Sequence, residues 1–197
     1  MKNRVLKILT LATLLVSSSL IANDFKIVTG ISGGYTHINV DQENQVGSVA
    51  LLNKPTQDGY NVELRLGYKY ENNLQLTVNY QRVEMDDTFE DNVYVEVEYF
   101  YPTYKRFTPY IGGHLGISHL EWTQNPINTL DNDVHSESYI AGARAGVLYP
   151  LVENLDLSME YIFSFTDHNT QLEFGTAKAT LTHNFSHNLN IGLRYTF

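Results

Sequence analysis

The stretch Tyr60-Asn-Val-Glu-Leu-Arg-Leu-Gly-Tyr-Lys-Tyr70 alternates strictly between two kinds of side chain. The odd-numbered residues of this stretch are polar or glycine. The even-numbered residues are apolar: Tyr60, Val62, Leu64, Leu66, Tyr68 and Tyr70. Successive side chains of a β-strand point to opposite faces, so a period of two predicts a strand with one apolar and one polar face. This one stretch already favours a sheet whose two surfaces meet different surroundings.

The same alternation recurs along the chain, and no convincing stretch with the helical period of 3.6 residues appears after residue 24. The expected strands are residues 25–36, 60–70, 74–81, 93–101, 109–118, 138–149, 155–165 and 189–197. The connections alternate between short (71–73, 105–108, 150–154) and long (37–59, 84–92, 121–137, 166–186). This order predicts an all-β fold, an eight-stranded antiparallel up-and-down barrel with its long connections at one end.

The N-terminus has the features of an export signal. Lys2, Arg4 and Lys7 precede an apolar run over residues 8–16, which is too short to span a membrane, and small residues lead to Ala22. We expect residues 1–22 to be a signal peptide and residues 23–197 to be the barrel domain.

Composition excludes several classes of function. The chain has no cysteine, which removes disulfides, thiolate metal sites and cysteine nucleophiles. Without the three bases of the signal, ten bases remain against 22 acids, a formal charge of −12. Nucleic acid is therefore not an expected partner, because binding phosphates needs a basic surface.

Aromatic residues indicate which face of the barrel meets lipid. Ten of the 14 tyrosines fall at strand ends, as in the aromatic girdles that bound the apolar band of membrane barrels. The expected girdle beside the short turns is Tyr68, Tyr70, Tyr99, Tyr101, Tyr149 and Tyr195. Alternation alone leaves open a soluble periplasmic, lipocalin-like binder, which would turn the same apolar face inward.

The last strand, Asn190-Ile-Gly-Leu-Arg-Tyr-Thr-Phe197, resembles the closing strand of Gram-negative outer-membrane barrels. With the signal, the strand count and the loop pattern, the chain resembles small barrels of the OmpA/OmpX-like, porin-like superfamily. The resemblance implies a location in the outer membrane, with both termini periplasmic and four long loops outside. It also implies that Phe197 is part of the signal read by the barrel-assembly machinery, and that outer-membrane lipid and lipopolysaccharide are partners of a monomer.

The polar face of the strands supplies a charged lumen. Eight strands enclose a space that side chains can fill, so its charges need partners. The expected lumenal network is Lys26, Glu63, Arg65, Lys69, Glu96, Glu98, Arg144, Asp156, Glu160 and Arg194. We expect a balanced structural plug in which Arg65 and Arg144 make bidentate bridges; the alternative is a narrow channel gated by these ion pairs.

Fourteen of the 22 acids fall in the long connections, most densely over residues 84–91. Their spacing matches no EF-hand loop. We therefore expect solvated acidic loops with no specific metal site and no cofactor.

Histidine and serine offer little support for an enzyme. In the alternating register His183 and His187 face away from Ser186, and His114 lies four residues from Ser118, more than about 12 Å by strand rise. A lipid-modifying barrel enzyme remains an alternative. The sequence favours a structural or surface-interaction role in envelope integrity, adhesion or resistance, with a surface ligand or host partner that no motif identifies.

One experiment tests the fold and the location together. The outer-membrane fraction is run on a detergent gel with and without boiling, and a folded membrane barrel shifts its mobility on heating. Recovery in a soluble fraction with no shift contradicts both expectations.

Overall fold

The computed structural model describes residues 25–46, 49–53, 56–86, 88–102, 106–122, 135–174 and 177–197. The expected signal peptide lies outside these residues. Everything regular among them is β-strand, and they contain no helix with the length and apolarity needed to cross a membrane. The strands are β1 (Phe25–Val46), β2 (Val49–Asn53), β3 (Thr56–Tyr70), β4 (Leu74–Met85), β5 (Thr88–Phe100), β6 (Thr108–Trp122), β7 (His135–Val152), β8 (Leu155–Phe174) and β9 (Ala177–Thr196).

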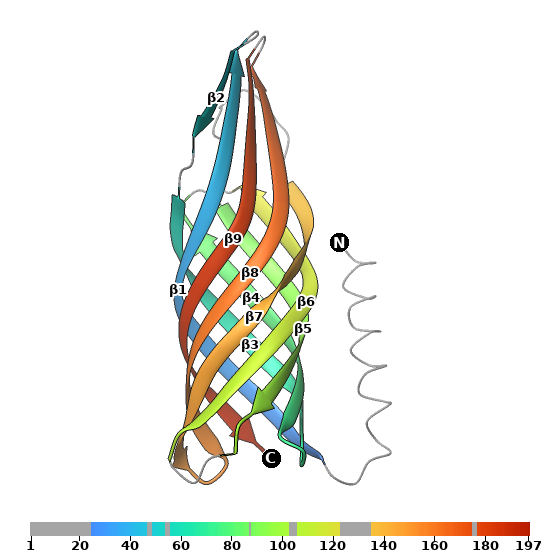
Figure 1. The fold of residues 1–197 in the computed structure, drawn as a ribbon, viewed down its shortest axis with the longest axis vertical. Coiled ribbons are helices and arrows are strands. Elements are labelled where there is room, and N and C mark those ends of the chain that lie inside the picture. Colours follow the sequence, from blue (N-terminus) through green and yellow to red (C-terminus); the bar gives the residue numbers. More distant parts are fainter. Residues whose placement is uncertain are drawn as a thin grey trace.

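Eight of these strands close into a barrel (Figure 1). Sequence neighbours from β3 to β9 pair antiparallel, β3 pairs with β1, and β9 returns to pair with β1. The short β2 adds only to the far end of β1. The predicted eight-stranded antiparallel up-and-down barrel is confirmed.

Tight turns define one end of the barrel, which we call the turn end; the opposite end is the loop end. Asn73 and Asn154 adopt positive φ angles of 63° and 67°, a conformation that asparagine tolerates better than most residues. The carbonyl groups of both residues accept backbone hydrogen bonds from Phe100 and Thr196 of the neighbouring strands. The beginning of β1 and the end of β9 also lie at the turn end (Figure 1).

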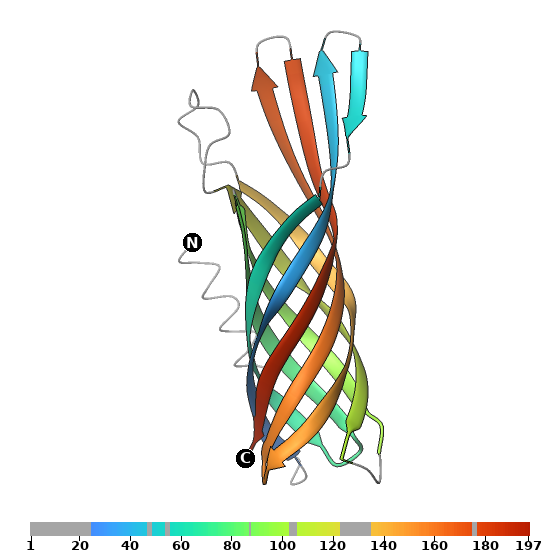
Figure 2. The ribbon, with the colours of Figure 1, turned by 90° about the vertical axis from the view of Figure 1, so that its left-hand side faces the viewer.

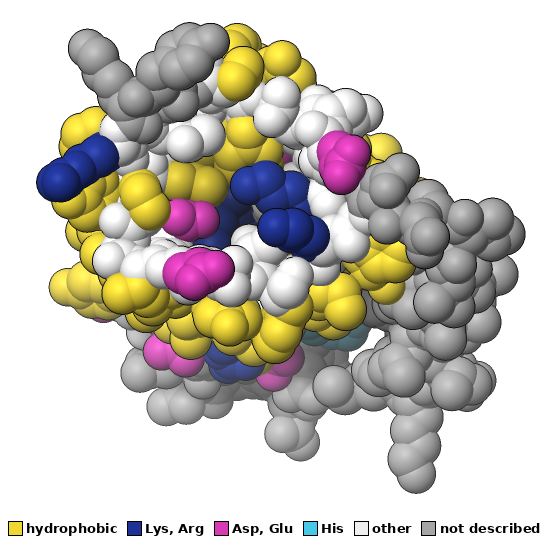
Figure 3. Space-filling view, turned by 90° about the horizontal axis from the view of Figure 1, so that it is seen from below, with side chains coloured by type: hydrophobic (Ala, Val, Ile, Leu, Met, Phe, Trp, Pro, Cys, Tyr) yellow, Lys and Arg dark blue, Asp and Glu magenta, His cyan; other side chains and the backbone are white. Residues whose placement is uncertain are grey.

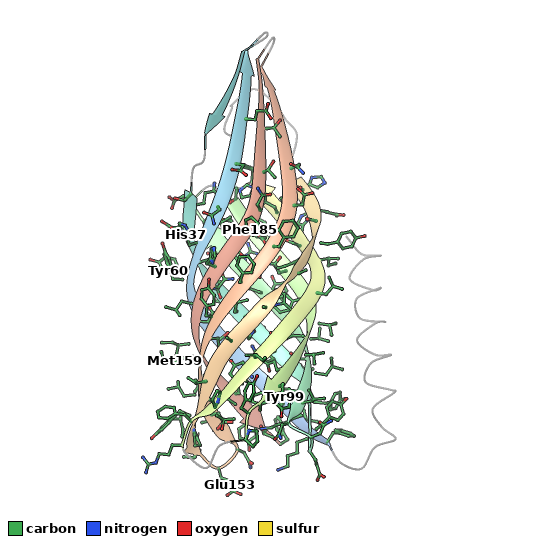
Figure 4. The ribbon with its side chains drawn as sticks, viewed as in Figure 1. His37, Tyr60, Tyr99, Glu153, Met159 and Phe185 are labelled. Carbon is green, nitrogen blue, oxygen red and sulfur yellow. The ribbon has the colours of Figure 1, made fainter. Side chains whose placement is uncertain are left out.

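The alternating pattern turns its apolar face outward. In β3, Leu64 and Leu66 are 50% and 59% exposed, whereas the residues that alternate with them, Glu63 and Arg65, are 1% and 4% exposed. Figure 4 shows the same orientation along the wall, with Met159 pointing outward between Tyr99 toward the turn end and Tyr60 toward the loop end. An apolar exterior around a polar interior excludes the lipocalin-like alternative, which requires the reverse.

The strands extend further toward the loop end than the alternation predicts. Three segments expected as long connections are strand over most of their described residues: β1, β2 and β3 take up most of residues 37–59, β4 and β5 take up residues 84–92 apart from the turn that joins them, and β8 and β9 extend to Phe174 and from Ala177 within residues 166–186. The acidic run is therefore a hairpin, and Glu90 within it points into the barrel and is buried. Beyond the apolar band both strand faces are polar, so the period of two that reveals a strand is lost there.

Three strands continue beyond the rest of the barrel. Past the pair Asn39 and Thr56, β1 leaves β3 and pairs with β2 on one side and β9 on the other. The result is a four-stranded sheet in the order β2-β1-β9-β8, here called the projecting sheet, which rises above the loop end (Figures 1 and 2).

Glycine is required where neighbouring strands come close. A Cβ on Gly142 of β7 would lie 2.1 Å from the Phe163 carbonyl oxygen and 2.6 Å from the His114 ring, whereas a Cβ on the outward-facing Gly113 would find its nearest atom at 3.7 Å. We predict that Gly142→Ala lowers the free energy of unfolding by about 1–3 kcal/mol and that the matched Gly113→Ala leaves it nearly unchanged. Urea titration of the two folded variants in vesicles measures this difference; equal stabilities contradict it.

Candidate functional site

Charged side chains from five strands meet in the middle of the lumen. Each of them is at most 4% exposed. They are Glu63 and Arg65 of β3, Glu96 and Glu98 of β5, Arg144 of β7, Glu160 of β8 and Arg194 of β9. These seven members of the predicted set form the lumenal network. Viewed from the turn end, basic and acidic side chains lie within a ring of hydrophobic ones (Figure 3).

Arg144 lies at the centre of the lumenal network. Its Nε donates to Glu96 Oε1 at 2.8 Å, and its Nη2 donates to Glu63 Oε2 at 2.8 Å. Its Nη1 also donates to Glu160. One guanidinium group therefore connects β7 with three other strands, because each of its three nitrogen atoms donates to a different carboxylate.

Arg65 and Arg194 complete the lumenal network. Arg65 donates to Glu63 at 2.8 Å, to Glu98 at 3.1 Å and to Glu160 at 3.2 Å. Arg194 holds Glu98 through two parallel hydrogen bonds of 2.8 and 3.0 Å. The bidentate bridge expected from Arg65 or Arg144 is thus made by Arg194, because its β9 position places both Nη atoms opposite one carboxylate.

Neutral side chains outside the predicted set add hydrogen bonds to the lumenal network. Tyr94 Oη donates to Glu63 Oε2 at 2.6 Å, Arg194 donates to Tyr110 Oη, and Gln75 Nε2 donates to Glu98 Oε2 at 2.8 Å. All three residues have the inward phase of their strands. The alternation of each strand is the sequence signal that marks these three neutral side chains as lumenal.

Three predicted members lie outside this buried cluster. Lys26 is exposed, and Lys69 and Asp156 are half-buried, because the inward positions nearest the turn end open to solvent. The buried cluster therefore contains four carboxyl and three guanidinium groups, a smaller set than the five acids and five bases expected along the whole polar face.

Small apolar clusters lie in the lumen on both sides of the lumenal network. Phe100, Tyr110 and Leu148 form a buried cluster toward the turn end. Ile38, Val40 and Val83 form another toward the loop end. Charges that are paired and packed between such clusters favour the plug over the gated channel.

Two serine–histidine pairs cross the lumen between β6 and β8. His114 Nε2 lies 3.0 Å from Ser164 Oγ, and His168 Nε2 lies 2.7 Å from Ser118 Oγ. A catalytic triad places a carboxylate on the other ring nitrogen, but both Nδ1 atoms lack a partner and Glu90 instead accepts from Ser118 at 2.9 Å. All these groups are at most 5% exposed, so these buried pairs are structural contacts with no access for a substrate.

The predicted girdle residues line the outside of the turn end. Tyr99, Tyr101 and Tyr195 are 39–43% exposed, and Phe197 is 67% exposed. Edge-to-face contacts join Tyr99 to Tyr101 and Tyr195 to Phe197. Tyr68, Tyr70 and Tyr149 are half-buried on the same outer face. A second aromatic belt lies toward the loop end, where Figure 4 labels Tyr60 and Phe185, and the two belts bound the apolar band.

Removing the central arginine should be far more damaging than removing a surface one. Arg144→Met leaves three buried carboxylates without their main partner, so we predict a loss of about 3–5 kcal/mol in the free energy of unfolding. Arg82→Met is the matched control, because Arg82 is 40% exposed and surface ion pairs contribute about 0–1 kcal/mol. Urea titration in vesicles measures both losses, and comparable losses would contradict a central role for Arg144.

Two lumenal variants, Arg144→Met and Glu96→Ala, separate plug from gate. A plug predicts negligible single-channel conductance for the wild type, for Arg144→Met and for Glu96→Ala in planar bilayers. A stable conducting state that appears on removal of either lumenal side chain would support the gate instead.

Comparison with solved structures places the fold among outer-membrane barrels. The crystal structure of Neisserial surface protein A aligns with a TM-score of 0.61 and 18% identity over 87% of this chain and 97% of that one. The bilayer structure of the outer membrane protein AlkL aligns with a TM-score of 0.55 and 16% identity over 89% and 91%. The protease OmpT from Escherichia coli gives a TM-score of 0.48 at 13% identity over 87% and 97%. No curated protein matches the chain in sequence.

The family is identified by sequence as well as by shape. Residues 8–197 match the outer membrane protein beta-barrel domain, a span that includes every strand of the barrel and the whole lumenal network. The chain therefore belongs to the outer membrane protein β-barrel family.

Proposed function

We propose that the protein is a plugged barrel of the outer membrane that acts at the cell surface through its projecting sheet, in adhesion or resistance. The filled lumen supports this role over transport, because the lumenal network and the two apolar clusters beside it leave the barrel wall as scaffold. In the orientation with both termini in the periplasm, the loop end faces outward and carries the sheet into the medium.

The observation that carries this proposal is the pair of open backbone edges on the projecting sheet. Among the described strands, β2 pairs only with β1, and the pairing of β7 with β8 ends at Ala141 and Phe165 while β8 continues to Phe174. Unpaired strand edges present rows of N–H and C=O groups that accept another strand. Such edges fit a protein partner with an exposed extended segment, which can pair with them as an added strand.

Acidic residues support a surface role without specifying a ligand. Asp58, Glu121 and Glu137 lie on the outer face at the loop end and are 44–56% exposed. Surface carboxylates of this kind associate with lipopolysaccharide through shared divalent cations. We therefore place lipopolysaccharide beside the barrel wall and the protein partner on the sheet above it.

Shortening the sheet tests this role. Residues 42–53 and 170–181 are each replaced by a two-residue Asn-Gly turn, which removes the upper part of the projecting sheet while keeping the barrel. We expect adhesion to epithelial cells and survival in serum to fall at least about tenfold for bacteria that express the shortened chain, since the loss of a strand-pairing surface removes most of the binding energy.

The control is the level of folded protein in the outer membrane, judged by its heat-dependent mobility, together with resistance to detergent. Unchanged adhesion and survival at equal protein levels would contradict the proposal. If the bacteria that express the shortened chain differ only in being more sensitive to detergent, the role of the protein is in envelope integrity instead.

A further inference from the structure

Two copies of the pattern His-x-Glu lie at the loop end, His119-Leu-Glu121 at the end of β6 and His135-Ser-Glu137 at the start of β7. The strands are antiparallel, and the register places His119 opposite Glu137 and Glu121 opposite His135. All four residues share the outer face, directly above the pair Ile117 and Tyr139. From this arrangement we propose a zinc-binding site made by His119, Glu121, His135 and Glu137 on the outer wall of the barrel.

The dimensions of the sheet suit one metal ion. Directly opposed side chains have Cβ atoms about 4.5–5.5 Å apart, and residues i and i+2 on one strand are about 7 Å apart. The four side chains thus occupy the corners of a small rectangle on a rigid surface. Imidazole and carboxylate side chains are long enough to reach a point above its centre.

The contacts already present lie near the values that a shared metal ion requires. His119 Nε2 lies 3.8 Å from Glu121 Oε2, and His119 Nδ1 lies 4.0 Å from Glu137 Oε1. Both separations exceed a hydrogen bond, whereas two ligands of one tetrahedral zinc ion lie about 3.3 Å apart, as follows from bonds of about 2.0 Å. The His119 and His135 rings lie side by side with centroids 5.8 Å apart.

Small side-chain rotations would bring the four side chains from their present positions onto one metal ion. Among the described residues, no three such side chains already converge on one metal position. His119, Glu121 and Glu137 have side chains that are 39–51% exposed, so the space beside them allows a change of rotamer. His119 turns Nε2 toward Glu121 and Nδ1 toward Glu137, so a rotation of its ring or of one carboxylate is needed to bring both carboxylates to a single ring nitrogen.

The surrounding charge favours a divalent cation. The same outer rows carry Glu84 and Asp91 on β4 and β5, and the single arginine among them, Arg82, lies 3.3 Å from Glu84 and 3.5 Å from Asp91. Four carboxylates against one guanidinium group leave a negative surface that raises the local concentration of cations. Two imidazoles with two carboxylates select zinc over calcium or magnesium, which prefer six or more oxygen ligands.

The site would join the ends of β6 and β7 where the chain leaves the barrel wall. This inference does not depend on the projecting sheet, which carries the proposed surface role; it assigns a metal ion to Glu121 and Glu137, two of the carboxylates placed beside lipopolysaccharide. Its matched control is His37, which lies on the outer face near Tyr60 (Figure 4) and contacts a single carboxylate, Asp58, at 2.7 Å.

The test uses the full mature chain, folded in detergent micelles and without a polyhistidine tag. ZnCl2 is titrated against a competing zinc dye. We expect one zinc per chain, at least about tenfold weaker binding in His119→Ala and in His135→Ala, as follows from the loss of one of four ligands, and unchanged binding in His37→Ala. Glu121→Gln should also weaken binding.

Two further readouts keep the outcome clear. CoCl2 in place of zinc should give the intense visible absorption of a four-coordinate ion in the wild type and not in His119→Ala. Zinc should also raise the unfolding temperature of the wild type and of His37→Ala, and raise it less in His119→Ala and in His135→Ala. Absence of zinc binding at 1 mM, or equal binding by the wild type and both histidine variants of the site, would overturn the proposal.

Discussion

The structure depends on the neutralisation of charge inside a barrel too narrow to hold bulk water. Arg65, Arg144 and Arg194 approach the lumen from three strands and share the carboxylates of Glu63, Glu96, Glu98 and Glu160. Ionic groups in such a space are stable only when each finds partners of good geometry. Because the partners come from β3, β5, β7, β8 and β9, the lumenal network ties distant parts of the wall together and fixes their register.

The wall follows from the same register. A slip of one residue between strands would expose the buried charges to lipid and turn the apolar band inward, so the lumenal network and the membrane band select the same pairing. Close contacts such as that of Gly142 with the Phe163 carbonyl group add a steric constraint. The aromatic belts then mark where the apolar band ends, at Tyr99 on one side and Tyr60 on the other.

Above the band, strand pairing continues without the demand for alternating side chains. This freedom produces both features to which we assign function, the projecting sheet and the His-x-Glu rectangle. The sheet offers unpaired backbone edges, and the rectangle offers four ligand side chains on a rigid surface. Neither feature needs a change in the plugged barrel, because the barrel serves as a stable base embedded in the membrane.

The sequence by itself determined the strand number, the antiparallel order, the inward phase of Glu63 and Arg144 and the outward phase of Leu64, because a period of two assigns each side chain to a face. It did not determine partners: the bidentate bridge of Arg194 with Glu98, the exposure of Lys26 and the contact of Ser118 with His168 depend on shear and on position along the barrel axis. Only the tertiary structure decided that residues 84–92 form a hairpin and that two His-x-Glu segments face each other. The physical reason is that local alternation reports which face a side chain occupies, whereas contacts across the barrel depend on how eight strands are staggered when the sheet closes.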